Sequence, residues 1–294
     1  MAKKNELIKK VVFWIILAIC TLWIVHPLVW MVLSSIRPEG EIFSRGFTLP
    51  SKISLDAYYW VLGLKELMDP NNPFRGTAGS FNFYRYILNG AVPGIITAII
   101  VAITTLFAGY SLARFSQRGV QALGTLYLSM QFLPAILMFV PLYLFFYTLR
   151  LIDTWAGLIL LYVVGSLPWA TWMMRSFIVS IPVELEESAM IDGCSRVQAI
   201  WRITMRLCAP GFVAVFLFTF TSAWNAYLPG LIISTTDASK PIAVGLAEML
   251  GWYGRAYWGG IMAASTLTTI PVAIIFVYLQ KWLIKGLTAG AIKA

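Results

Sequence analysis

Residues 181–211 read IPVELEESAMIDGCSRVQAIWRITMRLCAPG and form the longest charge-rich run between two apolar blocks. Pro182 lies where a helix can begin, because proline lacks an N–H that a first turn leaves unpaired. The positive end of the helix dipole favours the acids of this turn, which are Glu184, Glu186 and Glu187. Gly193 follows and can bend the backbone. The stretch therefore predicts two short helices, joined by a bend and presented on a loop that is suited to docking.

The second of these helices is amphipathic. Its apolar residues are Val197, Ile200, Trp201 and Ile203, and its basic residues are Arg196, Arg202 and Arg206. Pro210 and Gly211 close the stretch. The apolar face of this helix packs either into a partner or back onto the chain itself, and the sequence leaves both alternatives open.

The composition indicates a membrane protein of several spans. The chain has 294 residues, of which 59% are hydrophobic and only 12% are charged, and its mean hydropathy is +0.78. Apolar runs long enough to cross a bilayer recur along it. We predict an all-α membrane protein with six transmembrane helices, at about 11–36, 86–113, 120–147, 155–174, 208–234 and 257–280. Pro134 and Pro141 are expected to kink the third span.

The remaining segments are expected to form one permease domain with these spans. We assign an outer subdomain to residues 37–85, a cytoplasmic loop to 178–207 and a cytoplasmic tail to 281–294. Six spans place both termini and the central loop on one side, with thirteen of the 22 Lys and Arg residues. Nearly all of the net charge of +9 falls there, so that side is predicted to be cytoplasmic.

The energy source is predicted to lie in another subunit. The six spans contain no Asp, Glu, Lys or Arg, and His26 is their lone histidine. Carriers driven by ion gradients usually need carboxylates within the membrane. The chain also has no Gly-Lys pair, so it lacks the usual phosphate-binding loop for ATP. We expect no catalytic residues, no metal site and no cofactor in this chain, and the basic charge needs no nucleic-acid partner.

The spacing in the central stretch resembles the EAA loop (E-A-A-x3-G-x9-I-x-L-P) of permease subunits in ATP-driven importers that use a binding protein. The residues that carry the resemblance are Glu187, Ser188, Ala189, Asp192, Gly193 and Ile203. The sequence departs from the pattern at Ser188, Met205 and Arg206, and Arg206 in place of proline leaves the exit of the second helix open. The resemblance implies the type I ABC importer permease fold, in which this cytoplasmic loop carries the coupling helix that connects the chain to ATPase subunits. Glu187 is expected to make the main contact, with Glu184 or Glu186 as the alternative.

The C-terminal sequence is similar to the G-L-T-x-G-x-x-K ending of maltose-type (MalG-type) sugar-permease subunits. The matching residues are Gly286, Leu287, Thr288, Gly290 and Lys293, and residues 242–246 are also similar to that subunit. The resemblance implies a heterodimer with a second permease, two P-loop ATPase subunits that bind ATP and Mg, and an extracytoplasmic sugar-binding protein. It also implies that the tail contacts the ATPases and that the complex lies in a prokaryotic inner membrane.

Neutral polar and aromatic residues within the spans suit a sugar, which offers hydroxyl groups and apolar ring faces. The candidate substrate pathway comprises Gln131, Ser222, Asn225 and Tyr227. Helix packing is the alternative role for such residues. The sequence therefore predicts a non-enzymatic permease subunit that imports a sugar, maltose, maltodextrin or another oligosaccharide, by alternating access. A permease for a different small solute, or a channel or carrier without an ATPase, remains as the alternative.

Overall fold

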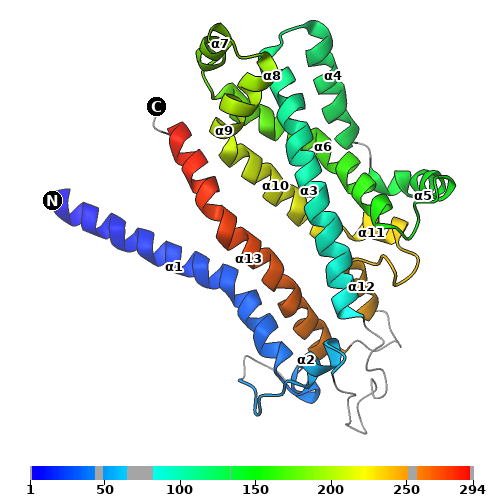
Figure 1. The fold of residues 1–294 in the computed structure, drawn as a ribbon. Helices are drawn as coiled ribbons and strands as arrows, with labels where there is room; N and C mark the ends of the chain where they lie inside the picture. Colours follow the sequence, from blue (N-terminus) through cyan, green and yellow to red (C-terminus); the bar gives the residue numbers. More distant parts are fainter. Residues whose placement is uncertain (1, 44–48, 65–81, 133, 251–256, 292–294) are drawn as a thin grey trace. The chain divides into compact units, whose positions relative to one another are not determined.

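The structure, a computed structural model, describes residues 2–43, 49–64, 82–132, 134–250 and 257–291. Within these ranges the regular elements are all helices, as Figure 1 shows. The predicted all-α class is therefore confirmed. The chain divides into one unit of residues 1–83 and 246–269 and a second unit of residues 84–245 and 270–294.

Four helices of the described chain are long and apolar enough to cross a membrane. They are α1 (Ala2–Ser35), α3 (Phe83–Arg114), α6 (Trp155–Val179) and α13 (Trp258–Ala291). They coincide with the first, second, fourth and sixth predicted spans. Helix α13 continues through the predicted start of the tail at residue 281, because no proline or strong turn signal interrupts it there.

The predicted third span is interrupted. Its residues form α4 (Arg118–Ser129), two short 3-10 turns, η2 (Met130–Phe132) and η3 (Ala135–Met138), and α5 (Phe139–Thr148). Pro134 lies in the break, where it removes an N–H and its ring obstructs a continuing helix. Pro141, the other predicted kink site, lies in the first turn of α5 and is tolerated there. The helices on either side, with 12 and 10 residues, are each shorter than a bilayer requires.

The predicted fifth span is also divided. It consists of α10 (Ala209–Trp224) and α11 (Tyr227–Ile233), separated by Asn225 and Ala226. The helical segment 196–207 meets α10 at an angle of 77°, and this pair counts as one more candidate span. The described chain thus shows four spans, or five with the bent pair, and the count of six stays a prediction.

In the first unit, two short helical segments pack on the start of α13. Helix α2 (Asp56–Val61) buries Trp60, whose ring contacts that of Tyr257 edge-on at 5.2 Å. In η1 (Glu39–Glu41), the Glu39 carboxylate accepts the backbone N–H groups of Trp258 and Gly259 at 3.0 and 2.9 Å. Burial raises the pKa of Glu39, and these two hydrogen bonds partly offset that rise. The carboxylate caps α13 where the helix dipole favours negative charge.

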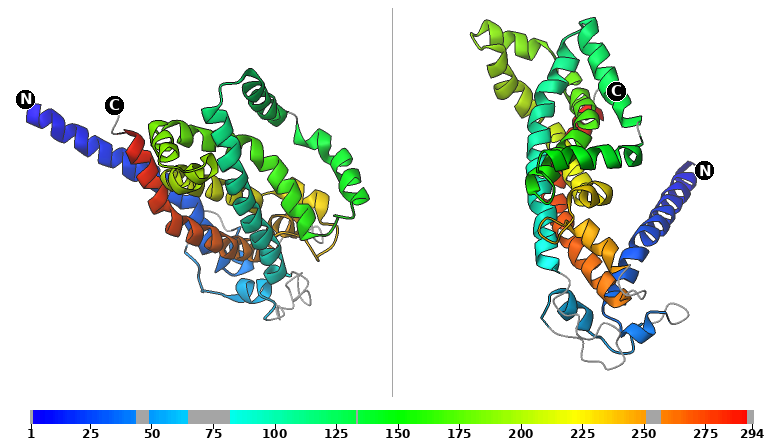
Figure 2. Two further views of the ribbon diagram at one scale, coloured as in Figure 1. Left: turned by 45° about the horizontal axis from the view of Figure 1, so that its top comes forward. Right: turned by 90° about the vertical axis from the view of Figure 1, so that its right-hand side faces the viewer.

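The second unit has its core between α3, α6 and α10, which lie side by side in both views (Figure 2). Buried apolar residues from all three helices fill it, including Val101, Leu106, Met174, Ile178 and Val215. Gly109 allows α3 to approach α6 closely, because a Cβ atom there would lie 2.9 Å from the backbone nitrogen of Arg175. This core gives the loops at either end of the unit a fixed base.

Candidate functional site

The first helix of the central loop is α7 (Glu184–Ile191). Pro182 precedes it by two residues and lies outside its first turn, so proline marks the approach to the helix and is not its first residue. At the other end, Gly193 N–H donates to Met190 O at 3.1 Å and Cys194 N–H to Ala189 O at 3.0 Å. This pair of bonds is the Schellman arrangement, which terminates a helix by using its last free carbonyls.

Gly193 provides the bend that the sequence predicts. Its φ angle is +91°, which residues other than glycine rarely adopt. A Cβ atom at this position would meet no atom within 4 Å. Within this chain, glycine is therefore required by its backbone angle and not by a close contact.

The second helical segment starts with a capping box and packs back onto the chain. Ser195 accepts the Gln198 N–H, and the Gln198 side chain accepts the Ser195 N–H. Helix α8 (Arg196–Ala199) then widens into a π-turn, η4 (Ile200–Thr204), and ends as α9 (Met205–Leu207). Ile200 is buried in the core of the second unit, and the Trp201 ring contacts that of Phe107 edge-on at 5.7 Å. Ile200 therefore packs against the chain itself, whereas Val197 and Trp201 of the same face keep 57% and 41% of their surface exposed.

The second segment ends in a sharp bend at Cys208. The helix runs through Arg206 to Leu207, bends at Cys208 and resumes with Pro210 in the first turn of α10. Proline is suited to this position because it lacks an N–H, and an N–H in the first turn would be unpaired. The chain thus turns sharply a few residues after the expected proline, without breaking the helical segment at Arg206.

The predicted coupling residues divide by exposure. Those exposed on α7 and its turn are Glu187, Ser188, Asp192 and Gly193. Ala189 is buried and Ile203 is partly buried. The neighbouring Ile191 is 86% exposed, a high value for an isoleucine. The exposed side of α7 thus carries acids beside bare apolar surface, which is a combination suited to a protein partner.

Glu186 points inward, which the pattern of three acids in this turn does not indicate. Its carboxylate accepts from Arg114 Nη2 at 2.8 Å, from the Tyr110 hydroxyl at 2.8 Å and from the Thr204 hydroxyl at 3.0 Å. Arg114 also donates to Ile181 O at 3.0 Å. We call Tyr110, Arg114, Glu186 and Thr204 the inner polar cluster. Of the three acids in this turn, only Glu184 and Glu187 therefore remain exposed to a partner.

The inner polar cluster keeps Glu186 ionised although it is buried. Burial alone raises the pKa of this carboxyl, but hydrogen bonds from Arg114, Tyr110 and Thr204 outweigh it and hold the pKa below its ordinary value. The side chains of Arg114 and Glu186 are 11% and 2% exposed. A pair so shielded from water interacts more strongly than a surface pair. The signal in the sequence was Tyr110 and Arg114, four residues apart on one face of a helix.

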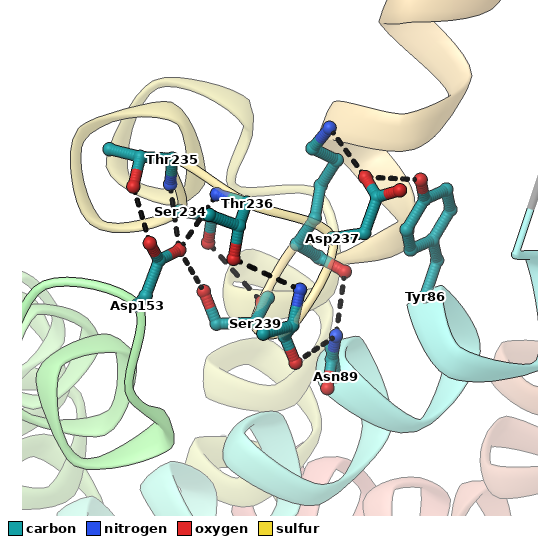
Figure 3. A network of polar contacts seen from close by, with 10 residues as sticks. Tyr86, Asn89, Asp153, Ser234, Thr235, Thr236, Asp237 and Ser239 are labelled. Atoms are coloured by element: carbon teal, nitrogen blue, oxygen red, sulfur yellow. Dashed lines mark hydrogen bonds and ion pairs between the residues drawn. The ribbon is translucent and has the colours of Figure 1, made fainter.

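A second polar cluster lies at the other end of the unit, between α5, α6 and the segment 234–241 (Figure 3). Asp153, whose φ is +57°, accepts the N–H groups of Thr235 and Thr236 at 2.8 and 2.9 Å. It also accepts the hydroxyl groups of Ser239, at 3.1 Å, and Thr235. Burial raises the pKa of Asp153, but these hydrogen bonds together lower it below its ordinary value. The carboxylate fixes the start of the segment to the α5–α6 turn.

The first turns of α3 hold the same segment from another side. The Asn89 amide donates to Ala238 O at 3.2 Å and to Lys240 O at 3.0 Å, and the Asn89 oxygen accepts from Trp155 at 2.8 Å. The Tyr86 hydroxyl donates to Asp237 at 2.8 Å (Figure 3). Lys240 also pairs with Asp237 at 2.9 Å. We call these residues, with those around Asp153, the outer polar cluster.

The residues of the candidate substrate pathway are only partly brought together. Gln131 lines a cavity of about 620 Å³, and its amide donates to Gly165 O at 3.1 Å. The same cavity is lined by α11 through Leu228, Pro229 and Ile232. The other three candidates, Ser222, Asn225 and Tyr227, are exposed but are not among its lining residues. The Asn225 amide donates to Thr221 O at 2.8 Å, in the last turn of α10.

The predicted ATPase-contacting tail lies at the edge of what the structure describes. Gly286, Leu287, Thr288 and Gly290 belong to the last turns of α13, although their side chains lie outside the described part. Lys293 lies outside the described residues altogether. Among the residues that are described, no three His, Cys, Asp or Glu side chains gather as a metal site would require.

Comparison with known protein families assigns the chain to a class of membrane transport proteins. Residues 105–289 match the model of the binding-protein-dependent transport system inner membrane component, and the chain belongs to this family. The match contains the whole central loop, residues 178–207, and all four residues of the inner polar cluster. The chain is therefore a multi-pass permease component of the inner membrane that works with a binding protein.

Individual relatives cover nearly the full length. The chain is 30% identical to the diacetylchitobiose uptake system permease protein DasC of Streptomyces coelicolor, over 92% of each chain. It is 29% identical to the trehalose/maltose transport system permease protein MalG of Thermococcus litoralis, over 99% of each. It is 30% identical to the inner membrane ABC transporter permease protein YcjP of Escherichia coli, over 100% of each. The resemblance to MalG-type sugar permeases is thereby confirmed.

Solved structures confirm the fold. A chain of a bacterial ABC transporter for the acidic polysaccharide alginate superposes with a TM-score of 0.66 at 23% identity, covering 94% of this chain and 97% of that one. A chain of a bacterial alginate ABC transporter, in complex with a periplasmic protein that binds an alginate pentasaccharide, gives a TM-score of 0.62 at 14% identity. The importer permease fold predicted from the sequence is the fold of this chain.

Proposed function

We propose that this chain is one of two permease subunits that carry an oligosaccharide across the cytoplasmic membrane by alternating access. Separate ATPase subunits supply the energy. The observation that carries the proposal is the central loop. One side of α7 is exposed, and its other side is fixed to the unit by hydrogen bonds of Glu186 with Arg114 and Thr204. A loop can pass a displacement to the spans only if it is anchored to them, and the inner polar cluster supplies that anchor.

The ATPase subunits dock on the exposed face of α7 in this proposal. Glu187 lies in the first turn of α7, where the helix dipole favours its charge, and is free to pair with an Arg or Lys of the ATPase. Ile191 offers apolar surface beside it. The last turns of α13 approach the same subunits. ATP and Mg are bound by the ATPases, and this chain contributes no cofactor.

The orientation in the membrane follows the distribution of basic residues. Both termini, the central loop and the inner polar cluster lie on the cytoplasmic side in this proposal. The segment 234–241 and the outer segments of the first unit then face the binding protein. Helix α1 exposes apolar surface along its span, and in this proposal lipid and the second permease cover it.

The cargo is proposed to be a sugar. Relatives named for diacetylchitobiose, trehalose and maltose, and neighbours named for alginate, support carbohydrate as the class. Gln131 beside the cavity at the break between α4 and α5 is the best-supported pathway residue, because interrupted helices commonly line transport sites. Ser222, Asn225 and Tyr227 present further exposed polar groups.

The experiment that tests the proposal is reconstitution of the complex, with its binding protein, in proteoliposomes. We expect uptake of at least one member of an oligosaccharide panel. Uptake should depend on ATP supplied on the side of the membrane that carries the ATPase subunits. Gln131→Ala should lower uptake more than Ser176→Ala, whose hydroxyl is bonded within its own helix to Trp172 O. Import of a different class of solute would reject the sugar, and failure to co-purify a P-loop ATPase would reject the energy source.

A further inference from the structure

Helix α3 is held by buried polar bonds at both ends. Asn89 and Tyr86, in its first turns, bind the segment 234–241. Tyr110 and Arg114, in its last turns, bind Glu186 of the central loop. Figure 1 shows α7 and α8 near the end of α3, while α11 and α12 (Ile242–Met249) lie near its beginning. One helix thus joins the central loop, which is the coupling loop of the proposed function, to a segment at the opposite end of the unit.

The bond at the inner end is specific and shielded. Glu186 receives its donors from α3 and from the second half of the loop, so a single carboxylate fixes both halves of the coupling loop to α3. Thr204, which donates from the π-turn, is fully buried. A displacement of α7 therefore cannot be absorbed by the loop alone without breaking charged hydrogen bonds.

The bond at the outer end is equally internal. Asn89 is 2% exposed and uses its amide on two carbonyls of the segment and its oxygen on Trp155. A Cβ atom at Gly245, just beyond the segment, would lie 2.5 Å from the Tyr86 ring. The segment is therefore seated on the first turns of α3 by hydrogen bonds and by close packing.

The two ends are too far apart to interact directly. Asn89 and Arg114 are 25 residues apart along one helix, which corresponds to about 37 Å. Side chains at such a distance have independent effects unless a rigid element connects them. Helix α3 is such an element, since it stays continuous over 32 residues, Pro93 included, and is packed against α6 and α10 through its middle.

We propose that α3 transmits displacements of the coupling loop to the segment 234–241, with Glu186, Arg114 and Asn89 as positioning residues for transport. The proposal rests on the proposed function, because it assigns the path by which ATPase docking at α7 reaches the opposite side. The segment responds to nucleotide at the ATPases, and a loaded binding protein acting on the segment changes the coupling loop in return, since coupling between sites is reciprocal.

A double-mutant cycle tests this path. The inner variant is Tyr110→Phe, which removes one donor from Glu186 and keeps its ion pair with Arg114. The outer variant is Asn89→Ala, and Ser176→Ala on α6 is the matched control. The assay is the stimulation of ATPase activity by loaded binding protein in reconstituted complexes. We expect each single variant to lose several-fold in stimulation, the double variant to lose no more than the larger single loss, and the control to retain wild-type stimulation.

Multiplication of the two single losses in the double variant would overturn the proposal, because it would show independent structural roles. A second measurement covers variants that assemble poorly. Ala238, which is exposed in the segment, is changed to cysteine in a background without Cys20, Cys194 and Cys208. Its labelling rate should change on ATP binding in the parent and not in Glu186→Gln. An unchanged response in Glu186→Gln would overturn the path. Wild-type complexes without any stimulation would instead reject the proposed function.

Discussion

Replacing Arg114 with methionine removes the cation of the inner polar cluster and keeps much of the volume of the side chain. Glu186 would lose its ion pair at 2.8 Å, and Ile181 O would lose its donor at 3.0 Å. Tyr110 and Thr204 would remain as neutral donors. Since the two charged side chains are 11% and 2% exposed, solvent cannot replace the lost partner. Breaking such a pair costs about 3–5 kcal/mol.

The pH dependence gives this prediction a distinct sign. In the wild type, the pKa of Glu186 is lowered, so its stabilisation is present above the ordinary carboxyl pKa and is lost as the pH falls through the folded value. Without Arg114, burial dominates and raises the pKa of Glu186 above its ordinary value. The variant should therefore gain stability relative to the wild type as the pH falls, because protonation removes the uncompensated charge.

The assay is denaturant unfolding in mixed micelles, compared at neutral and mildly acidic pH. Arg118→Met is the matched control, since Arg118 is exposed at the start of α4, and it should change stability by less than about 0.5 kcal/mol. Equal losses in the two variants would refute the reasoning. A loss in Arg114→Met that did not shrink towards acidic pH would refute the buried, unpaired charge as its cause.

Three further predictions concern the coupling loop and the topology. Gly193→Ala should destabilise the bend by roughly 1–2 kcal/mol, because its φ is +91°, and hydrogen exchange of α7 should speed up; unchanged exchange would contradict the strain. Glu187→Ala should weaken ATPase binding by about 1.5–3 kcal/mol, measured by titration of the ATPase, and unaltered affinity would assign the contact to another residue. Cysteines at Ala238 and Gln117, both exposed, should label from outside and from inside respectively, and the reverse pattern would overturn the orientation.

Much of the fold was predictable because hydropathy and charge act locally. The apolar runs of α1, α3, α6 and α13 can be recognised without knowledge of their packing partners. The bend at Gly193 is indicated by the residue type alone. The break near Pro134 was predicted only as a kink. Whether a proline bends or interrupts a helix depends on what surrounds the freed carbonyls, and the sequence around it does not specify that.

The inner polar cluster was not predictable from the loop alone. Three acids lie within one turn, and their identical chemistry hides which of them points inward. The rotation of α7 is decided by Tyr110 and Arg114, which lie 76 and 72 residues before Glu186. Asp153 is a similar case, because its partners in the segment 234–241 are more than eighty residues away. The role of such carboxylates depends on hydrogen-bond donors from segments that are distant in the sequence.

The energy source is the central claim, and one measurement tests it most directly. The complete complex is reconstituted with its binding protein, and the P-loop lysine of the ATPase subunit is replaced. Oligosaccharide uptake should then be lost, while the two permeases and the ATPases still assemble. Uptake that persisted in this variant, continued after depletion of ATP and followed an imposed proton gradient would contradict the account.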